Sequence, residues 1–301
     1  MQGLSPFPRH LAVLILCLLS CSFAANHIAA RIAFDHDTGL LLTMLCRAGV
    51  TALVLAALVL WQRHSLRLPA STWRWQLLLG LLIAIQSFCI YSAVARVPVA
   101  IALLVVNLSP ILFILLNWAL GGPAPTRQAM AIMLVIMIGL VLVLDVPQRL
   151  ESASLSETQW LAGVLFSLTG AGVFAVALWI TEHRLSSVAG SVRSMLTLMV
   201  VVISAASLGA TDVLPGSLNL PNASIGWLAL ACVVLLYGAA FSTLFICMPR
   251  LNLAQNAPVM NMEPVAGMVL GWLILDQFLS PLQILGGLVV VGGIALLAYR
   301  K

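Results

Sequence analysis

The stretch Asn261-Met262-Glu263-Pro264 places an amide, an acid and a proline near the middle of one apolar segment, residues 254–275. That segment is long enough to cross a bilayer, which takes about 20 helical residues. A carboxylate at membrane depth costs about 2.5–3.5 kcal/mol on insertion scales, so it usually faces a cavity or a partner. A proline removes one helical hydrogen bond and strains the turn before it. The stretch therefore predicts a membrane-spanning helix that is interrupted where its polar groups gather.

A similar pattern occurs 154 positions earlier, as Asn107-Leu108-Ser109-Pro110. The same offset relates further identical pairs, namely Trp73 and Trp227, Arg96 and Arg250, Ala100 and Ala254, Trp118 and Trp272, and Gly139 and Gly293. One ungapped offset over about 65 residues indicates an internal duplication. Interrupted hydrophobic segments at matching positions of two halves are the best sequence indication of a transporter's binding site.

The composition is that of a polytopic membrane protein. The chain has 301 residues, of which 62% are hydrophobic and 8% charged, whereas soluble domains carry about 25% charged residues. All six cysteines fall in apolar segments without zinc-ligand spacing, which favours packing roles. The net charge of +5 is only a weak indication of a nucleic-acid partner, because the basic residues are mostly spread over short loops. The expected partners are therefore the lipid bilayer and a small solute, with no nucleic acid.

The fold class expected is all-α, with ten transmembrane helices. They are predicted over residues 9–31, 39–61, 73–95, 98–120, 126–145, 159–182, 190–213, 224–248, 252–275 and 281–299. The run after Pro8 continues to about Ala30 without a convincing cleavage site, so it is predicted to be a retained span and not a signal peptide. The first repeat takes residues 1–147 and the second 148–301, with a Ser- and Glu-rich linker at about 146–158.

The distribution of basic residues predicts the orientation. With the N-terminus inside, the cytoplasmic side carries Arg9, Arg63, Arg67, Arg74, Arg127, Arg184, Arg193, Arg250, Arg300 and Lys301. The opposite side carries Arg31, Arg96 and Arg149. This asymmetry places both termini in the cytoplasm. Because each repeat has five spans, an odd number, the second repeat enters the membrane from the opposite side. The repeats are therefore predicted to be inverted, with spans four and nine meeting near the midplane.

Ten predicted spans in two five-span repeats resemble the EamA-type exporters of the drug/metabolite transporter superfamily, and the resemblance covers nearly the whole chain. The strongest local match consists of Asn261 to Gly267, Gly271 to Asp276, Leu279 to Gly286 and Gly292-Gly293. Members of this family end each repeat with a proline-containing helix, a small-residue stretch, an acid and a glycine-rich last helix. The resemblance implies ten spans that move small metabolites, commonly amino acids and related compounds, across the bacterial inner membrane, usually outward.

The chain departs from the family pattern at two places. The family often has Glu where this chain has Asp276, and the first repeat reads Gly121-Gly122-Pro123 with no acid there. Ser109 also stands where the second repeat has Glu263. A role that needs a carboxylate in both halves is therefore not expected.

Glu263 and Arg47 are the charged candidates for the substrate site. Glu263 is the only acid predicted deep inside a span, and it serves either as a proton or cationic-group site or as a carboxylate that caps broken backbone or pairs with an arginine. Asn256 lies seven residues earlier, on the same face of a regular helix. Arg47 lies about 10 Å along span two at 1.5 Å per residue. A structural or snorkelling role is favoured for Arg47; pairing with Glu263 or binding of a substrate carboxylate is the alternative.

The matched amides Asn107 and Asn261 stand beside the predicted helix breaks at Pro110 and Pro264. The favoured interpretation is that each amide bonds backbone freed by its proline, and the alternative is contact with substrate. The other candidates are polar or aromatic residues in spans one, three and eight: Asn26, His27, Gln86, Ser87, Tyr91, Tyr237, Phe241, Ser242 and Phe245. Polar tips on aromatic bodies suit an amphipathic solute. Ordinary helix packing is the simpler interpretation for any one of them, and hydrogen bonding is favoured for His27.

The sequence thus predicts a secondary transporter of small polar or amphipathic metabolites, expected to be an exporter of amino acids or related compounds by alternating access between the repeats. No cofactor and no metal site are expected. The sequence contains neither a Walker loop nor a His-Glu-x-x-His motif, so no such motif indicates an enzyme. The alternatives are a non-transporting membrane partner or a lipid-handling, flippase-like protein, and an intramembrane enzyme. Proton antiport and facilitated exchange both stay open, as do the substrate, the direction and the oligomeric state.

Overall fold

A computed structural model describes residues 6–62, 68–94, 96–97, 99–143, 157–211, 216–275 and 280–299. Within these ranges the chain is helical and contains no strand, which confirms the all-α prediction. The helices are α1 (Arg9–Asp35), α2 (Leu40–Trp61), α3 (Ala70–Val94), α4 (Val99–Val106), α5 (Ser109–Ala119), α6 (Arg127–Val143), α8 (Glu157–His183), α9 (Gly190–Gly209), α10 (Ser224–Leu251), α11 (Leu253–Asn256), the 3₁₀ helix η1 (Ala257–Asn261), α12 (Met262–Leu275) and α13 (Pro281–Tyr299). Every predicted span overlaps at least one of them. Asp276, most of the 146–158 linker and several loop or terminal arginines lie outside the described residues.

Among the described residues, six helices are long and apolar enough to cross a membrane, namely α1, α2, α3, α8, α9 and α10. Shorter apolar helices occur at Ser109–Ala119, Met130–Leu142 and Pro281–Leu296. Large aliphatic side chains stand exposed along these helices, among them Leu53 at 72%, Leu60 at 74% and Leu235 at 71%. Exposed apolar surface of this extent would be a liability in water but is what hydrocarbon covers. The chain is a multi-pass membrane protein.

The chain forms two compact units that do not follow the two halves of the sequence. The first contains Met1–Ala24, Gln86–Trp179 and Arg250–Lys301, and the second contains Ala25–Ile85 and Ile180–Pro249. Each unit therefore combines helices from both predicted repeats. Spatial clustering and duplication are different properties, so the division of the sequence at residue 147 remains a prediction about its origin.

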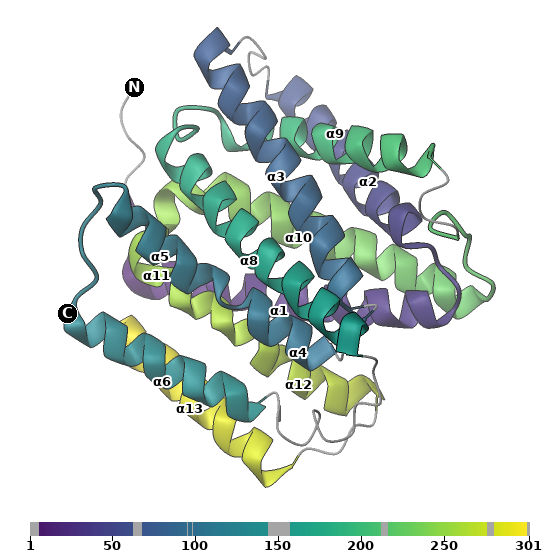
Figure 1. Cartoon of the computed structure of the whole chain (residues 1–301). Coiled ribbons are helices and arrows are strands. Elements are labelled where there is room, and N and C mark those ends of the chain that lie inside the picture. Colours follow the sequence, from purple (N-terminus) through teal and green to yellow (C-terminus); the bar gives the residue numbers. More distant parts are fainter. Residues whose placement is uncertain are drawn as a thin grey trace. The chain divides into compact units, whose positions relative to one another are not determined.

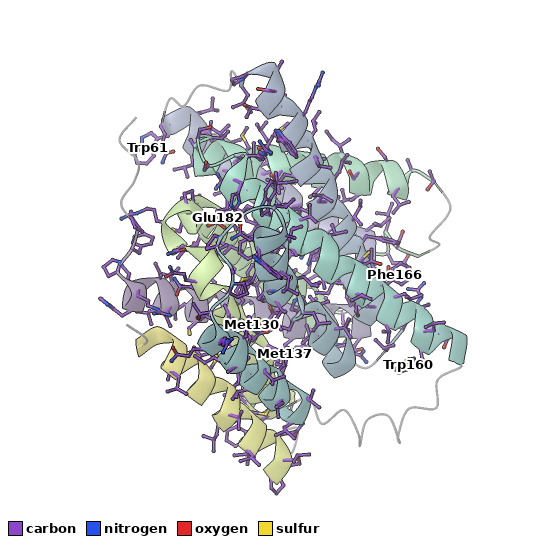
Figure 2. All side chains as sticks on the ribbon, turned by 60° about the vertical axis from the view of Figure 1, so that its left-hand side comes forward. Trp61, Met130, Met137, Trp160, Phe166 and Glu182 are labelled. Carbon is purple, nitrogen blue, oxygen red and sulfur yellow. The ribbon has the colours of Figure 1, made fainter. Side chains whose placement is uncertain are left out.

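In the first unit, α6 and α13 lie side by side (Figures 1 and 2). A Cβ atom on Gly139 would lie 2.9 Å from the Val290 side chain, and one on Gly293 would lie 2.7 Å from the Ile136 side chain. Gly139 and Gly293 are related by the offset of 154, and so are Ile136 and Val290. The two contacts are thus the same contact with its partners exchanged, as a two-fold axis between the helices requires.

In the second unit, α2 and α9 lie side by side (Figure 1). Glycines let α3 and α10 approach this pair closely. A Cβ atom on Gly80 would lie 2.5 Å from Val200, and one on Gly238 would lie 2.8 Å from the Thr51 hydroxyl. Small residues at such crossings are the usual means of packing helices in a membrane, where lipid supplies no hydrophobic force between helices.

Candidate functional site

The first interrupted helix breaks at Asn107. Helix α4 ends at Val106, and α5 begins at Ser109 with Pro110 in its first turn. Proline is tolerated at such a position because its missing N–H has no partner in a first turn. The Asn107 side chain is 4% exposed, and its Nδ2 donates to the Leu103 carbonyl at 2.8 Å.

The second interrupted helix has a longer break. Helix α11 ends at Asn256, η1 continues to Asn261, and α12 begins at Met262 with Glu263 and Pro264 in its first turn. Nδ2 of Asn256 donates to the Leu251 carbonyl at 2.8 Å, and Nδ2 of Asn261 donates to the Pro258 carbonyl at 3.0 Å. Glu263 is half-buried.

The favoured interpretation expects each amide to bond the backbone carbonyl that its proline frees, and the structure gives both amides a different carbonyl. Pro110 and Pro264 have no N–H, so they leave the carbonyls of Val106 and Met260 without the donor that a regular helix supplies. The amides of Asn107 and Asn261 bond other carbonyls. The hydroxyl of Ser20, on α1, instead donates to the Met260 carbonyl at 3.4 Å.

Asn256 and Asn261 each have a buried side-chain oxygen that could accept a hydrogen bond from a solute. Both side chains are buried, at 3% and 1% exposure, and the Oδ1 atom of each accepts no hydrogen bond within the described part of the chain. A buried acceptor without a donor costs roughly 1–3 kcal/mol. The break in α11–α12 therefore presents two oxygen atoms that a donor from a solute or a water molecule would stabilise.

The 3₁₀ turn also changes the direction in which Glu263 projects. A regular helix turns 100° per residue and would bring Glu263 to within about 20° of Asn256 after seven residues. A 3₁₀ helix turns 120° per residue, so the five residues of η1 add about 100°. The predicted common helical face of Asn256 and Glu263 is therefore wrong for this geometry.

In the second unit the structure brings together two of the predicted residues, Arg47 and Tyr237. The Arg47 guanidinium carbon lies 4.1 Å from the Tyr237 ring centroid, and both side chains are buried, at 4% and 5% exposure. The Tyr237 ring stacks on Phe241 at 5.2 Å, and Phe241 stacks on Phe245 at 4.4 Å. Arg47 is thus covered by protein and held over an aromatic face, which argues against snorkelling to the interface.

The other predicted residues are divided between the units. Asn26, on α1 in the second unit, is 1% exposed and donates to the Val233 carbonyl at 3.0 Å, and its neighbour His27 is half-buried. Ser242 on α10 is half-buried in the same unit. In the first unit, Tyr91 is 1% exposed and Gln86 half-buried, both on α3. Their convergence with Glu263 on one cavity stays a prediction.

Arg193 is counted in the sequence only among the basic residues of the cytoplasmic side, but in the structure its side chain is completely buried. At 0% exposure, its Nη1 donates to the carbonyls of Leu185, at 2.8 Å, and Val188, at 3.4 Å, and its Nη2 donates to the Phe245 carbonyl. Its own carbonyl accepts a hydrogen bond from Gln76 at 3.2 Å. The position of Arg193, three residues into a predicted apolar span, could have indicated its burial, because an arginine inside a span is also what made Arg47 a candidate.

Comparison with known proteins places the chain in a family. The sequence model of the EamA-like transporter family matches residues 10–145 and, a second time, residues 161–299. Protein PecM of Dickeya dadantii (strain 3937) is 27% identical over 249 residues, which cover 78% of this chain and 79% of PecM. A solved structure described only as "Crystal structure of protein" shares the fold, with a TM-score of 0.77, 22% identity and 98% of both chains covered. Because the family match takes in most of its length, the chain belongs to the EamA-like transporter family.

Proposed function

We propose that this protein is a secondary transporter that exports a small polar or amphipathic metabolite, an amino acid or a related compound. Membership of the family supports transport of a small molecule. The observation that carries the proposal is the pair of interrupted helices, which break at equivalent positions, Asn107 and Asn261, in the two halves. Interrupted helices of this kind form the midplane sites of transporters with inverted repeats.

The chemistry of the candidate residues supports the class of substrate. The Oδ1 atoms of Asn256 and Asn261 are buried acceptors that receive no hydrogen bond from the described residues, and an ammonium group is a donor that would satisfy them. Glu263 adds a carboxylate to the same interrupted helix. Arg47 presents a guanidinium, whose planar fork matches a carboxylate, and Tyr237 holds that group by its ring. An amino acid carries an ammonium group and a carboxylate, the two groups that the chemistry of these side chains matches.

The proposed mechanism is alternating access, in which the two inverted repeats rock around the site. Its support is the exchange symmetry of the Gly139–Val290 and Gly293–Ile136 contacts and the double match of the family model. The proposed location is the bacterial inner membrane with both termini in the cytoplasm. The burial of Arg193 removes one residue from the cytoplasmic count, and nine basic residues against three still support this orientation. A reporter fused after Lys301 tests it and should give a cytoplasmic signal.

Counterflow in proteoliposomes tests the function. Purified protein is loaded with one unlabelled solute at a time, and uptake of the labelled solute is measured across amino acids, amines and carboxylates. Exchange of amino acids that exceeds exchange of the simple amines and carboxylates supports the proposal. A folded protein that exchanges no member of the panel contradicts it, and lipid scrambling then becomes the next assay.

A further inference from the structure

Arg96 holds one contact between the two halves of the sequence. It follows the last turn of α3, and its guanidinium carbon lies 5.0 Å from the ring centroid of Phe166 on α8. Its Nη1 also donates to the Ser92 carbonyl at 2.8 Å. Phe166 lies edge-on to Phe88 at 6.1 Å, and Figure 2 shows Phe166 and Trp160 on the same helix. Arg96 is therefore stacked on a ring that α8 and α3 hold in place.

Arg250 holds a second contact of the same kind. Its guanidinium carbon lies 3.8 Å from the ring centroid of Phe7, and the Phe7 backbone N–H donates to the Arg250 carbonyl at 2.9 Å. Phe7 stands between Pro6 and Pro8, whose rings fix the backbone that leads into α1. Arg250 lies in the last turn of α10, directly after Pro249 and shortly before the interrupted helix begins at Leu253.

Arg96 and Arg250 are equivalent under the offset of 154, and each reaches a phenylalanine from the other half of the sequence. Arg96 of the first half binds Phe166 of the second, and Arg250 of the second half binds Phe7 of the first. The orientation proposed above puts Arg96 at the outer face of the membrane and Arg250 at the cytoplasmic face. Movement of one repeat against the other must therefore strain these two contacts in opposite senses.

We propose that these two pairs are the latches of the transport cycle, an outer latch formed by Arg96 and Phe166 and an inner latch formed by Arg250 and Phe7. The proposal rests on the rocking mechanism proposed above. Helices α6 and α13 serve as the pivot, because their reciprocal glycine contact lies on the pseudo-two-fold axis and needs no change when the repeats rock.

The chemistry of the latches suits a contact that opens and closes. A guanidinium over a phenylalanine ring has no directional hydrogen bond to break, and its attraction weakens as water reaches the charge. Opening of one face hydrates its own arginine, while the other pair stays closed. Both pairs are in contact in the structure, so in terms of this proposal both latches are closed.

Reversible cross-linking tests the latches. In a parent protein with the six cysteines replaced by alanine, we would introduce Phe7→Cys with Arg250→Cys, and separately Arg96→Cys with Phe166→Cys. Each pair is linked with a bis-methanethiosulfonate reagent and tested for counterflow before linking, after linking and after reduction. We expect linking of either pair to lower exchange at least tenfold and reduction to restore it.

The matched control is Arg31→Cys with Asp35→Cys. These two side chains are exposed and paired on one turn of α1, so a link between them cannot restrain one repeat against the other. Unchanged exchange after linking of a latch pair overturns the latches and leaves the transporter proposal standing. A parent protein that exchanges nothing counts instead against the proposed function.

A second measurement serves if the paired variants are inactive before linking. In the parent with Phe166→Cys alone, reactivity toward an impermeant maleimide added outside is compared with and without Arg250→Gln. Loss of the inner latch favours the inward-open state, so we expect labelling at this position to fall at least threefold. Labelling that does not change overturns the proposal.

Discussion

Arg193→Met removes the guanidinium that ties three backbone carbonyls together in the second unit. In the native protein this fully buried side chain donates to Leu185 and Val188, in the turn between α8 and α9, and to Phe245 in α10. Methionine fills most of the volume but donates nothing. The three carbonyls therefore lose the donors that Arg193 supplies.

The expected loss in the free energy of unfolding follows from the hydrogen bonds that Arg193 makes. A hydrogen bond to a charged group contributes about 1.5–3 kcal/mol, so the bonds to Leu185 and Phe245 together contribute about 3–6 kcal/mol. The Val188 contact, at 3.4 Å, adds little. Removing the buried charge recovers part of its desolvation cost, which moves the expected loss toward the lower end of that range. We therefore expect Arg193→Met to lower the free energy of unfolding by about 3–4 kcal/mol.

The assay is unfolding of purified protein in mixed micelles by increasing sodium dodecyl sulfate, followed by tryptophan fluorescence. Arg193→Lys keeps the charge but has a compact ammonium that cannot reach both α10 and the α8–α9 turn, so we expect about half the loss. Arg31→Met is the matched control, because Arg31 is half-exposed and pairs with Asp35 across one helical turn, an interaction of about 0.3–0.5 kcal/mol. An Arg193→Met protein as stable as Arg31→Met would refute the reasoning.

Three further outcomes are expected. Tyr237→Leu should destabilise the protein by about 1–2 kcal/mol more than Tyr237→Phe, since phenylalanine keeps the ring under Arg47; equal unfolding midpoints would contradict this. Gly293→Leu should cost about 1–3 kcal/mol because its Cβ would lie 2.7 Å from a side chain of α6, whereas Gly292→Leu, facing open space, should leave the midpoint unchanged. If Glu263 carries a coupling proton, Glu263→Gln should abolish transport driven by a pH gradient; normal transport at every pH would make Glu263 structural and the protein a facilitator or exchanger.

The approximate positions of the helices in the sequence were predictable from local patterns. Apolar runs of about 20 residues identify spans without reference to their partners, because a helix in lipid satisfies its own backbone. The interruption at Asn261 was also predictable, since a proline beside an acid and an amide disturbs any helix that contains it. The 3₁₀ form of residues 257–261 was not, and it moved Glu263 away from the face of Asn256.

The partners of the buried charges could not be predicted. Arg47 stacks on Tyr237, 190 positions away in the sequence, and Arg193 bonds the carbonyl of Phe245, 52 positions away. A guanidinium accepts a ring, a carboxylate or a carbonyl as partner, so the type of residue alone does not decide among them. Only the approach of α10 to α2 and α9 determines which partner is available.

Structural and substrate-binding roles of the two asparagines at the second helix break, Asn256 and Asn261, do not exclude one another. An asparagine side chain has two donor hydrogens on Nδ2 and acceptor capacity on Oδ1. In Asn256 and Asn261 one donor is used by a backbone carbonyl of the broken helix, which fixes the rotamer of the side chain. That fixed rotamer in turn fixes the position of Oδ1, which is buried and accepts nothing from the described residues. The hydrogen bond from Nδ2 that satisfies a backbone carbonyl of the broken helix is therefore the same bond that would position Oδ1 for a solute. The helix break thus provides both the carbonyl that holds the side chain and the acceptor that would bind the solute.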